Sequence, residues 1–246
     1  MEPKEIFMSH KRKQSHKVLM TSQTMKTTEF ASSRLLKVYT EELYWLCEQI
    51  DLKCEKLFKF HSAMPNEFSV SADIEGLDLV YSILSYAAKA QEIIFNFSKN
   101  KEKLHEGRAK YIQGLLQPLA LKEMLNKKVR NTIEHFGEYL DVANEVHTAF
   151  RAPKKYAVAF NLVISHWNRF DDQAFPFSLY KIPQLDLPLY PVRVYVSDEK
   201  VFYNLDWSIE LAVVHKEAID IKRHLISRKV FKEENPEKWI SKMIIC

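Results

Sequence analysis

Residues 127–146 are KKVRNTIEHFGEYLDVANEV, and this stretch decides the expected fold because its polar and apolar side chains separate at helical spacing. A helix turns by about 100° per residue. At that spacing four apolar residues form one narrow stripe suited to a core: Val129, Ile133, Phe136 and Leu140. The polar arc carries Arg130, Asn131, Glu134 and His135. We therefore predict a helix whose polar arc points away from the core of its own chain.

Helical periodicity also covers the residues before this stretch. Between residues 29 and 61, apolar residues recur every three or four positions, which predicts one long helix. Ser71 or Asp73 can cap a second helix, and a third is expected at about 103–116. Residues 29–150 are therefore predicted to form a bundle of four to five helices with short connections.

The chain changes character after residue 150. Residues 156–164 are an apolar run that suits either a strand or a buried helical turn. Alternating valine and tyrosine residues predict a hairpin at about 192–205, and a final helix is expected at about 207–227. The predicted fold class is therefore mainly α, with a small α+β appendage over 151–246.

Composition excludes several classes of protein. The 246 residues include only 4 Gly, and neither G-x-G-x-x-G nor the P-loop pattern occurs, so a dinucleotide or P-loop enzyme is excluded. No apolar run approaches the ~20 residues of a membrane span. The 3 Cys form no disulfide framework, so we expect a cytoplasmic protein in which Cys47 and Cys54 pack in the core. No zinc-enzyme signature occurs, and neither a metal nor a cofactor is expected.

Positive charge concentrates in parts of the chain, although the net charge is only +4. Residues 1–28 form a basic arm that is expected to be flexible, and a second basic cluster lies at 222–232. Both are consistent with phosphate contacts, and both are also consistent with solvated surfaces.

The polar arc matches a family motif. Arg130, Asn131 and His135 stand at R-N-x-x-x-H spacing. This resembles the HEPN superfamily, helical bundles whose ribonuclease members carry R-x4-6-H, often with Asn, Asp or His after the Arg. Uncharacterised bacterial HEPN-like proteins with an R-N-x-x-E-H-F helix are also similar. The resemblance covers about half of the chain, and it departs from toxin-type members at Gly137, where they place Tyr. Glycine also weakens a helix, so a bend is expected at Gly137.

The resemblance implies a metal-independent endoribonuclease that acts as a homodimer, in a toxin or defence system with an antitoxin or another partner protein. Arg130 is then expected to clamp a phosphate and His135 to transfer protons. Asn131 is expected to orient the phosphate or the imidazole, and Glu134 to hold Arg130. Three lysines are expected to bind RNA: Lys122, Lys127 and Lys128.

Two alternatives use the same arc without catalysis. One is a non-catalytic HEPN-like dimerisation module that binds RNA, a nucleotide or a protein partner, with Arg130 as an anion anchor. The other is a solvated helix face on which Arg130 and Glu134 form an i,i+4 pair. Cleavage of RNA separates the enzyme from both.

Overall fold

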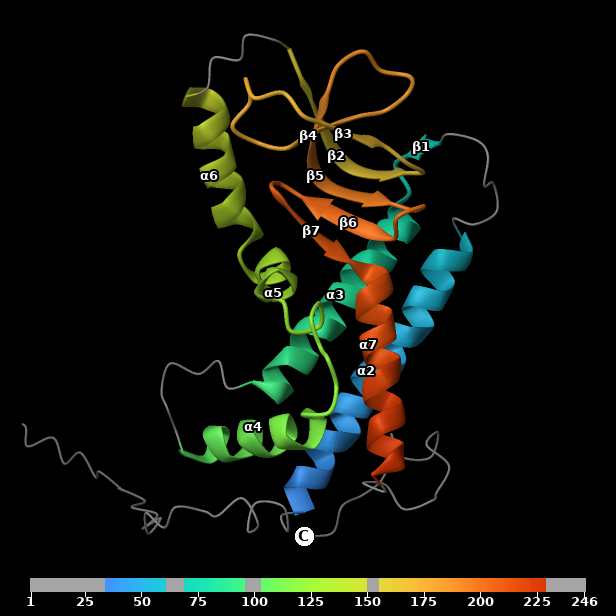
Figure 1. The fold of residues 1–246 in the computed structure, drawn as a ribbon, viewed down its shortest axis with the longest axis vertical. Helices are drawn as coiled ribbons and strands as arrows, with labels where there is room; N and C mark the ends of the chain where they lie inside the picture. The colour runs from blue at the N-terminus through green and yellow to red at the C-terminus, as the bar shows by residue number, and fades with distance from the viewer. Residues whose placement is uncertain (1–33, 61–68, 96–102, 150–154, 229–246) are drawn as a thin grey trace, which may run out of the picture.

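The computed structural model describes residues 34–60, 69–95, 103–149 and 155–228. These residues form six helices and a seven-stranded mixed sheet (Figure 1). The predicted mainly-α class is therefore wrong, because the fold mixes α and β structure. The basic arm over 1–28 lies outside the described residues.

Three of the expected helices occur where periodicity placed them: α2 (Arg34–Phe60), α3 (Ile74–Ile94) and α4 (Lys103–Leu116). Asp73 caps α3, since its side chain accepts the backbone N–H of Gly76 at 3.0 Å. Cys47 and Cys54 are buried on α2, as predicted. These helices do not close a bundle on their own. α2 packs against both α3 and a helix from the far end of the chain, α7 (Leu211–Ser227).

The expected single helix over 127–146 is two helices, α5 (Lys127–Glu134) and α6 (Phe136–Ala149). The break lies at His135, with φ −121° and ψ 20°, two residues before the expected bend at Gly137. The two helices serve different cores. Val129 is buried in the helical core, whereas Phe136 packs on the sheet. One straight helix cannot direct its apolar residues at both cores, so the predicted continuous stripe was wrong.

Seven strands form the sheet: β1 (Val70–Ser71), β2 (Ala157–Ile164), β3 (Asn168–Phe170), β4 (Leu179–Lys181), β5 (Leu189–Val196), β6 (Val201–Asn204) and β7 (Trp207–Glu210). Their order is β1-β2-β5-β4-β3, and β6 pairs with β5 and β7. β2 and β5 are parallel, whereas the other pairs are antiparallel. The expected hairpin exists as β5–β6, and the ambiguous apolar run at 156–164 is strand β2.

The largest hydrophobic cluster joins both halves of the chain. It includes Leu43 and Ile83 from the first two helices, Tyr195 and Phe202 from the sheet, and Val214 from α7. In Figure 1, α7 lies along α2 below the sheet. No helix in the described ranges has the length and apolar character that crossing a membrane requires.

A polar network joins α2 to α7 beside this core. The Nζ of Lys222 donates to Asp51 Oδ2 at 2.6 Å, and Lys222 also pairs with Glu48. The Nε2 of His215 lies 2.7 Å from Asp51 Oδ1. Burial raises the pKa of Asp51, but the hydrogen bonds from Lys222 and His215 outweigh it and lower that pKa. The network fixes the contact between the first and last described helices.

Two neighbouring strands share an unusual backbone feature. Asn161 in β2 and Arg193 in β5 have φ of 52° and 60°, in the left-handed region. They are adjacent in register, because pairing resumes on both sides of them, from Phe160 with Val192 to Leu162 with Val194. A left-handed residue of this kind reverses the alternation of side chains between faces. Odd-numbered residues before this pair and even-numbered residues after it therefore point to the same face of the sheet. They pack in one hydrophobic cluster, which includes Ala159, Leu189, Ile164, Val194 and Val196.

Candidate functional site

The loop before α5 is fixed by a buried carboxylate. Glu217 of α7 is 4% exposed. Its Oε1 accepts the backbone N–H of Lys122 at 2.5 Å and of Glu123 at 3.1 Å, and its Oε2 accepts that of Met124 at 2.5 Å. Three consecutive N–H groups thus converge on one side chain, which anchors residues 122–124 to α7.

A buried amide holds the other side of the same loop. The Nε2 of Gln91 in α3 donates to the carbonyl of Met124 at 2.6 Å and to that of Asn126 at 2.8 Å. Asn126 then caps α5, because its Oδ1 accepts the backbone N–H of Lys128 at 3.0 Å. The start of α5 is therefore positioned by α3 and α7 together.

His135 lies at the break between α5 and α6 with a carboxylate near each ring nitrogen. Nδ1 is 3.3 Å from Glu138 Oε2, and Nε2 is 3.8 Å from Glu134 Oε2. The side chain of His135 is 40% exposed, so the imidazole is accessible to a ligand in solution. A carboxylate beside an imidazole helps to set the orientation of the ring. The break therefore presents an oriented imidazole at the surface.

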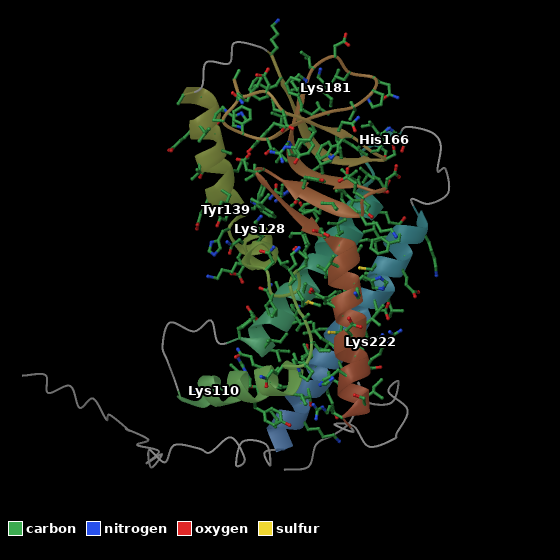
Figure 2. All side chains as sticks on the ribbon, in the orientation of Figure 1. Lys110, Lys128, Tyr139, His166, Lys181 and Lys222 are labelled. Atoms are coloured by element: carbon green, nitrogen blue, oxygen red, sulfur yellow. The ribbon has the colours of Figure 1, made fainter. Side chains whose placement is uncertain are left out.

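Asn131 and Tyr139 form a hydrogen bond across the same break. The Nδ2 of Asn131 donates to the Tyr139 hydroxyl at 2.9 Å. This bond ties the second turn of α5 to the first turn of α6. Tyr139 was not among the predicted site residues, although it is exposed and its backbone N–H donates to the carbonyl of His135 at 3.2 Å. In Figure 2, Lys128 lies on α5 and Tyr139 lies on the adjoining end of α6.

The predicted RNA-binding lysines fall into two groups. Lys127 and Lys128 are exposed on the first turn of α5. The Nζ of Lys122 instead lies 3.7 Å from the carboxylates of both Glu123 and Glu210, so it faces the start of α7. The side chain of Arg130 lies outside the described residues, although its backbone belongs to α5.

The sheet contributes an arginine beside this break that the sequence did not indicate. The guanidinium carbon of Arg193 lies 3.5 Å from the ring centroid of Phe136, the first residue of α6. The same carbon is 5.3 Å from the ring centroid of Tyr81 in α3. Arg193 therefore occupies the junction between the sheet, α3 and the start of α6. No local pattern in the sequence marks a residue that reaches the site through a left-handed backbone.

The histidine within α6, His147, packs against aromatic side chains of the sheet instead of facing solvent. The ring of His147 stacks on Phe177 with centroids 4.1 Å apart and contacts Tyr190 at 4.3 Å. It also hydrogen-bonds the hydroxyl of Tyr156. Burial lowers the pKa of His147, and the charge of Asp206 opposes that shift. We assign His147 to the attachment of α6 to the sheet.

Other polar groups in the described chain do not assemble a metal centre. No group of three or more His, Cys, Asp or Glu side chains is arranged around one point there. The Nε2 of His224 in α7 lies 2.8 Å from the carbonyl oxygen of Leu115 in α4, so this histidine joins two helices. A surface pocket of about 450 Å³ lies beside Asp171, Asp172 and Asp206, away from every residue of the motif.

Comparisons with family models, with curated proteins and with solved structures found no match to this chain. Its function therefore has to be inferred from the break at His135 and the groups around it. Those groups offer an oriented imidazole, an amide bonded to a phenol, and basic side chains on α5.

Proposed function

We propose that this protein is a metal-independent endoribonuclease of HEPN type that acts as a homodimer. The observation that carries the proposal is the exposed imidazole of His135, held next to Glu138 at a helix break. Proton transfer by histidine near neutral pH is the chemistry that such a group performs best. Asn131 lies one helical turn before His135, and Lys127 and Lys128 lie on the first turn of the same helix, so α5 carries polar groups that a phosphodiester substrate needs.

The proposed reaction is an internal transfer within RNA. The ribose 2′-hydroxyl loses its proton to His135 and attacks the adjacent phosphorus. The bond from phosphorus to the 5′-oxygen breaks, and that oxygen takes a proton from a second acid. The products are a 2′,3′-cyclic phosphate and a 5′-hydroxyl. Glu138 stabilises the imidazolium, Arg130 binds the phosphate, and Asn131 with Tyr139 orients it.

The need for a base and an acid favours a two-fold dimer. Each chain supplies one accessible histidine at the break, so the second proton-transfer group comes from the partner copy. α6 contains no buried residue and exposes three apolar side chains on one side, Tyr139, Val142 and Val146. On a helix these lie within about 60° of one another. A self-complementary contact along this stripe brings the two breaks together.

Purified protein incubated with single-stranded RNA in EDTA tests the proposal. We expect cleavage that leaves 2′,3′-cyclic phosphate ends, and we expect DNA of the same sequence to survive because it lacks the 2′-hydroxyl. His135→Ala should keep the fold and lose roughly 10²–10⁴ in rate. His166→Ala is the matched control, since His166 is similarly exposed but lies beside Asp198, in the connections that follow β2 and β5. Cleavage that needs a divalent metal, or that survives in His135→Ala, would refute the mechanism.

One observation favours a second candidate, a non-catalytic dimerisation module. Glu134 and Glu138 place two carboxylates against His135, and carboxylates repel RNA phosphates. A protein partner with a basic surface fits such a break. If diverse RNAs are neither cleaved nor bound, while the protein remains a dimer by light scattering, the module replaces the nuclease.

A further inference from the structure

Arg193 has an environment that is unusual for a half-buried arginine. Its guanidinium contacts two aromatic rings, Phe136 and Tyr81, and no carboxylate among the described residues forms an ion pair with it. Aromatic faces hold a guanidinium by cation–π attraction and leave its N–H edge free. The positive charge of Arg193 is therefore fixed in place without being neutralised.

The inner nitrogen of this guanidinium is shut off from solvent. Nε of Arg193 is buried and has no hydrogen-bond partner within the described chain. The residue as a whole is half-buried. Part of the side chain is therefore accessible, and the two terminal N–H groups of a guanidinium can together bind one phosphate.

The backbone at Arg193 is specified by its surroundings. Its φ of 60° is uncommon for a residue with a side chain. The backbone N–H donates to Oδ1 of Asn204 at 3.2 Å, and Asn204 is fully buried in β6. A strained residue that is held in this way directs its side chain to a defined place. That place is the ring of Phe136, the residue next to His135.

We propose that Arg193 is a phosphate-binding residue of the site at the α5–α6 break, and that its ligand is the RNA backbone. This inference rests on the proposed function. It makes the sheet part of the binding surface, so the second half of the chain contributes a cation to a site otherwise built from α5 and α6. Arg193 binds a backbone phosphate next to the reacting one. The ring of Phe136 holds the guanidinium at a fixed position relative to His135.

The test is the salt dependence of binding to a single-stranded oligonucleotide with 2′-fluoro sugars, which cannot be cleaved by this chemistry. Fluorescence anisotropy gives the dissociation constant at several salt concentrations. Loss of one phosphate contact lowers the slope of log K against log salt by about 0.7 for a single strand. We expect Arg193→Gln to show that loss and to weaken binding roughly tenfold or more.

Two further variants separate this role from a purely structural one. Arg193→Lys keeps the charge and should keep the wild-type slope while binding more weakly, because lysine lacks the planar stack and the paired N–H groups. Arg169→Gln is the control, since Arg169 is exposed on β3 and its Nε pairs with Asp171 at 2.8 Å. It should leave both slope and affinity unchanged. If Arg193→Gln fails to fold, Arg193→Lys with wild-type affinity would still overturn the proposal.

Cleavage of natural RNA in EDTA, measured alongside, separates the two proposals. Wild-type cleavage together with an unchanged slope in Arg193→Gln overturns the role of Arg193 and leaves the nuclease standing. Binding with the expected loss of slope but no cleavage supports Arg193 and removes the catalytic proposal. Absence of any wild-type binding to the oligonucleotide overturns the role of Arg193.

Discussion

Replacing Glu217 should release the loop that positions α5, and the structure sets the size of the effect. The Glu217 carboxylate accepts three backbone N–H groups, from Lys122, Glu123 and Met124. An unpaired buried donor costs about 1–3 kcal/mol. Water can reach the first of these groups more easily than the other two, because Lys122 is exposed while Glu123 and Met124 are buried. We therefore expect Glu217→Ala to lower the free energy of unfolding by about 3–5 kcal/mol.

The change to glutamine keeps the side-chain volume, so it measures the loss of the charge and of one acceptor without the loss of packing. Glu217→Gln keeps one oxygen and replaces the other with an amide nitrogen, which faces a backbone N–H instead of accepting it. We expect a loss of about 2–3 kcal/mol. Urea denaturation measures both variants, and each kcal/mol corresponds to roughly 2–4 °C in melting temperature at this chain length. Glu210→Gln, an exposed carboxylate next to α7, should change stability by less than about 0.5 kcal/mol.

Two results would refute this account of the loop. One is Glu217→Gln with a denaturation midpoint equal to that of wild type, which would mean that the three N–H bonds are not maintained in solution. The other is a large loss of stability with unchanged hydrogen exchange at Lys128 and Val129. Because Glu217 anchors residues 122–124, the start of α5 should exchange faster in both variants.

Further predictions concern the sheet, the helix contact and pH. Phe136→Ala should cost about 1–3 kcal/mol in urea unfolding, below the cost of emptying a fully buried site, because Phe136 is half-buried; Leu140→Ala should cost less, since Leu140 is 38% exposed. Lys222→Met should lower stability at neutral pH by about 2–4 kcal/mol, as it leaves Asp51 and Glu48 without their cation. That difference should shrink in acid, because a carboxylate with a lowered pKa loses its stabilising effect as pH falls through that pKa. Burial lowers the pKa of His147 below 6.5, so the neutral imidazole stabilises the fold fully above pH 6.5, and this stabilisation is lost as the pH falls through the lowered pKa. A His147→Phe variant should therefore lose less stability between pH 7 and 5 than wild type does.

Local sequence patterns were enough to predict much of the helical structure. The spacing of apolar residues predicted α2, α3 and α4, and Asp73, one of the two candidate caps, does cap α3. The fold class failed because the sheet depends on pairings between distant segments. β1 has only two residues, and β2 pairs in parallel with β5 although β3 and β4 lie between them in the sequence. Neither pairing leaves a periodic signal in the sequence.

The candidate site was predicted only where it depends on local sequence, and its tertiary contacts were missed. Glu134 and His135 lie beside each other at the end of α5, whereas the side chain of Asn131 bonds to Tyr139 of α6. The break at His135 was not foreseen, because it follows from Phe136 packing on the sheet rather than from the propensity of Gly137. Tyr139 joins the site through a bond that depends on this break, and Arg193 joins it through tertiary structure alone.

The paired left-handed residues Asn161 and Arg193 also discriminate against misaligned strands during folding. If β5 slipped by one residue against β2, Val192 or Val194 would have to adopt the left-handed conformation beside Asn161. A β-branched residue is a severe outlier there. A slip by two residues would demand a positive φ from Pro191, whose ring fixes φ near −65°. Parallel strands assemble slowly because their segments are distant in sequence. This pair therefore gives the assembling sheet a single alignment that it can reach without strain at neighbouring residues.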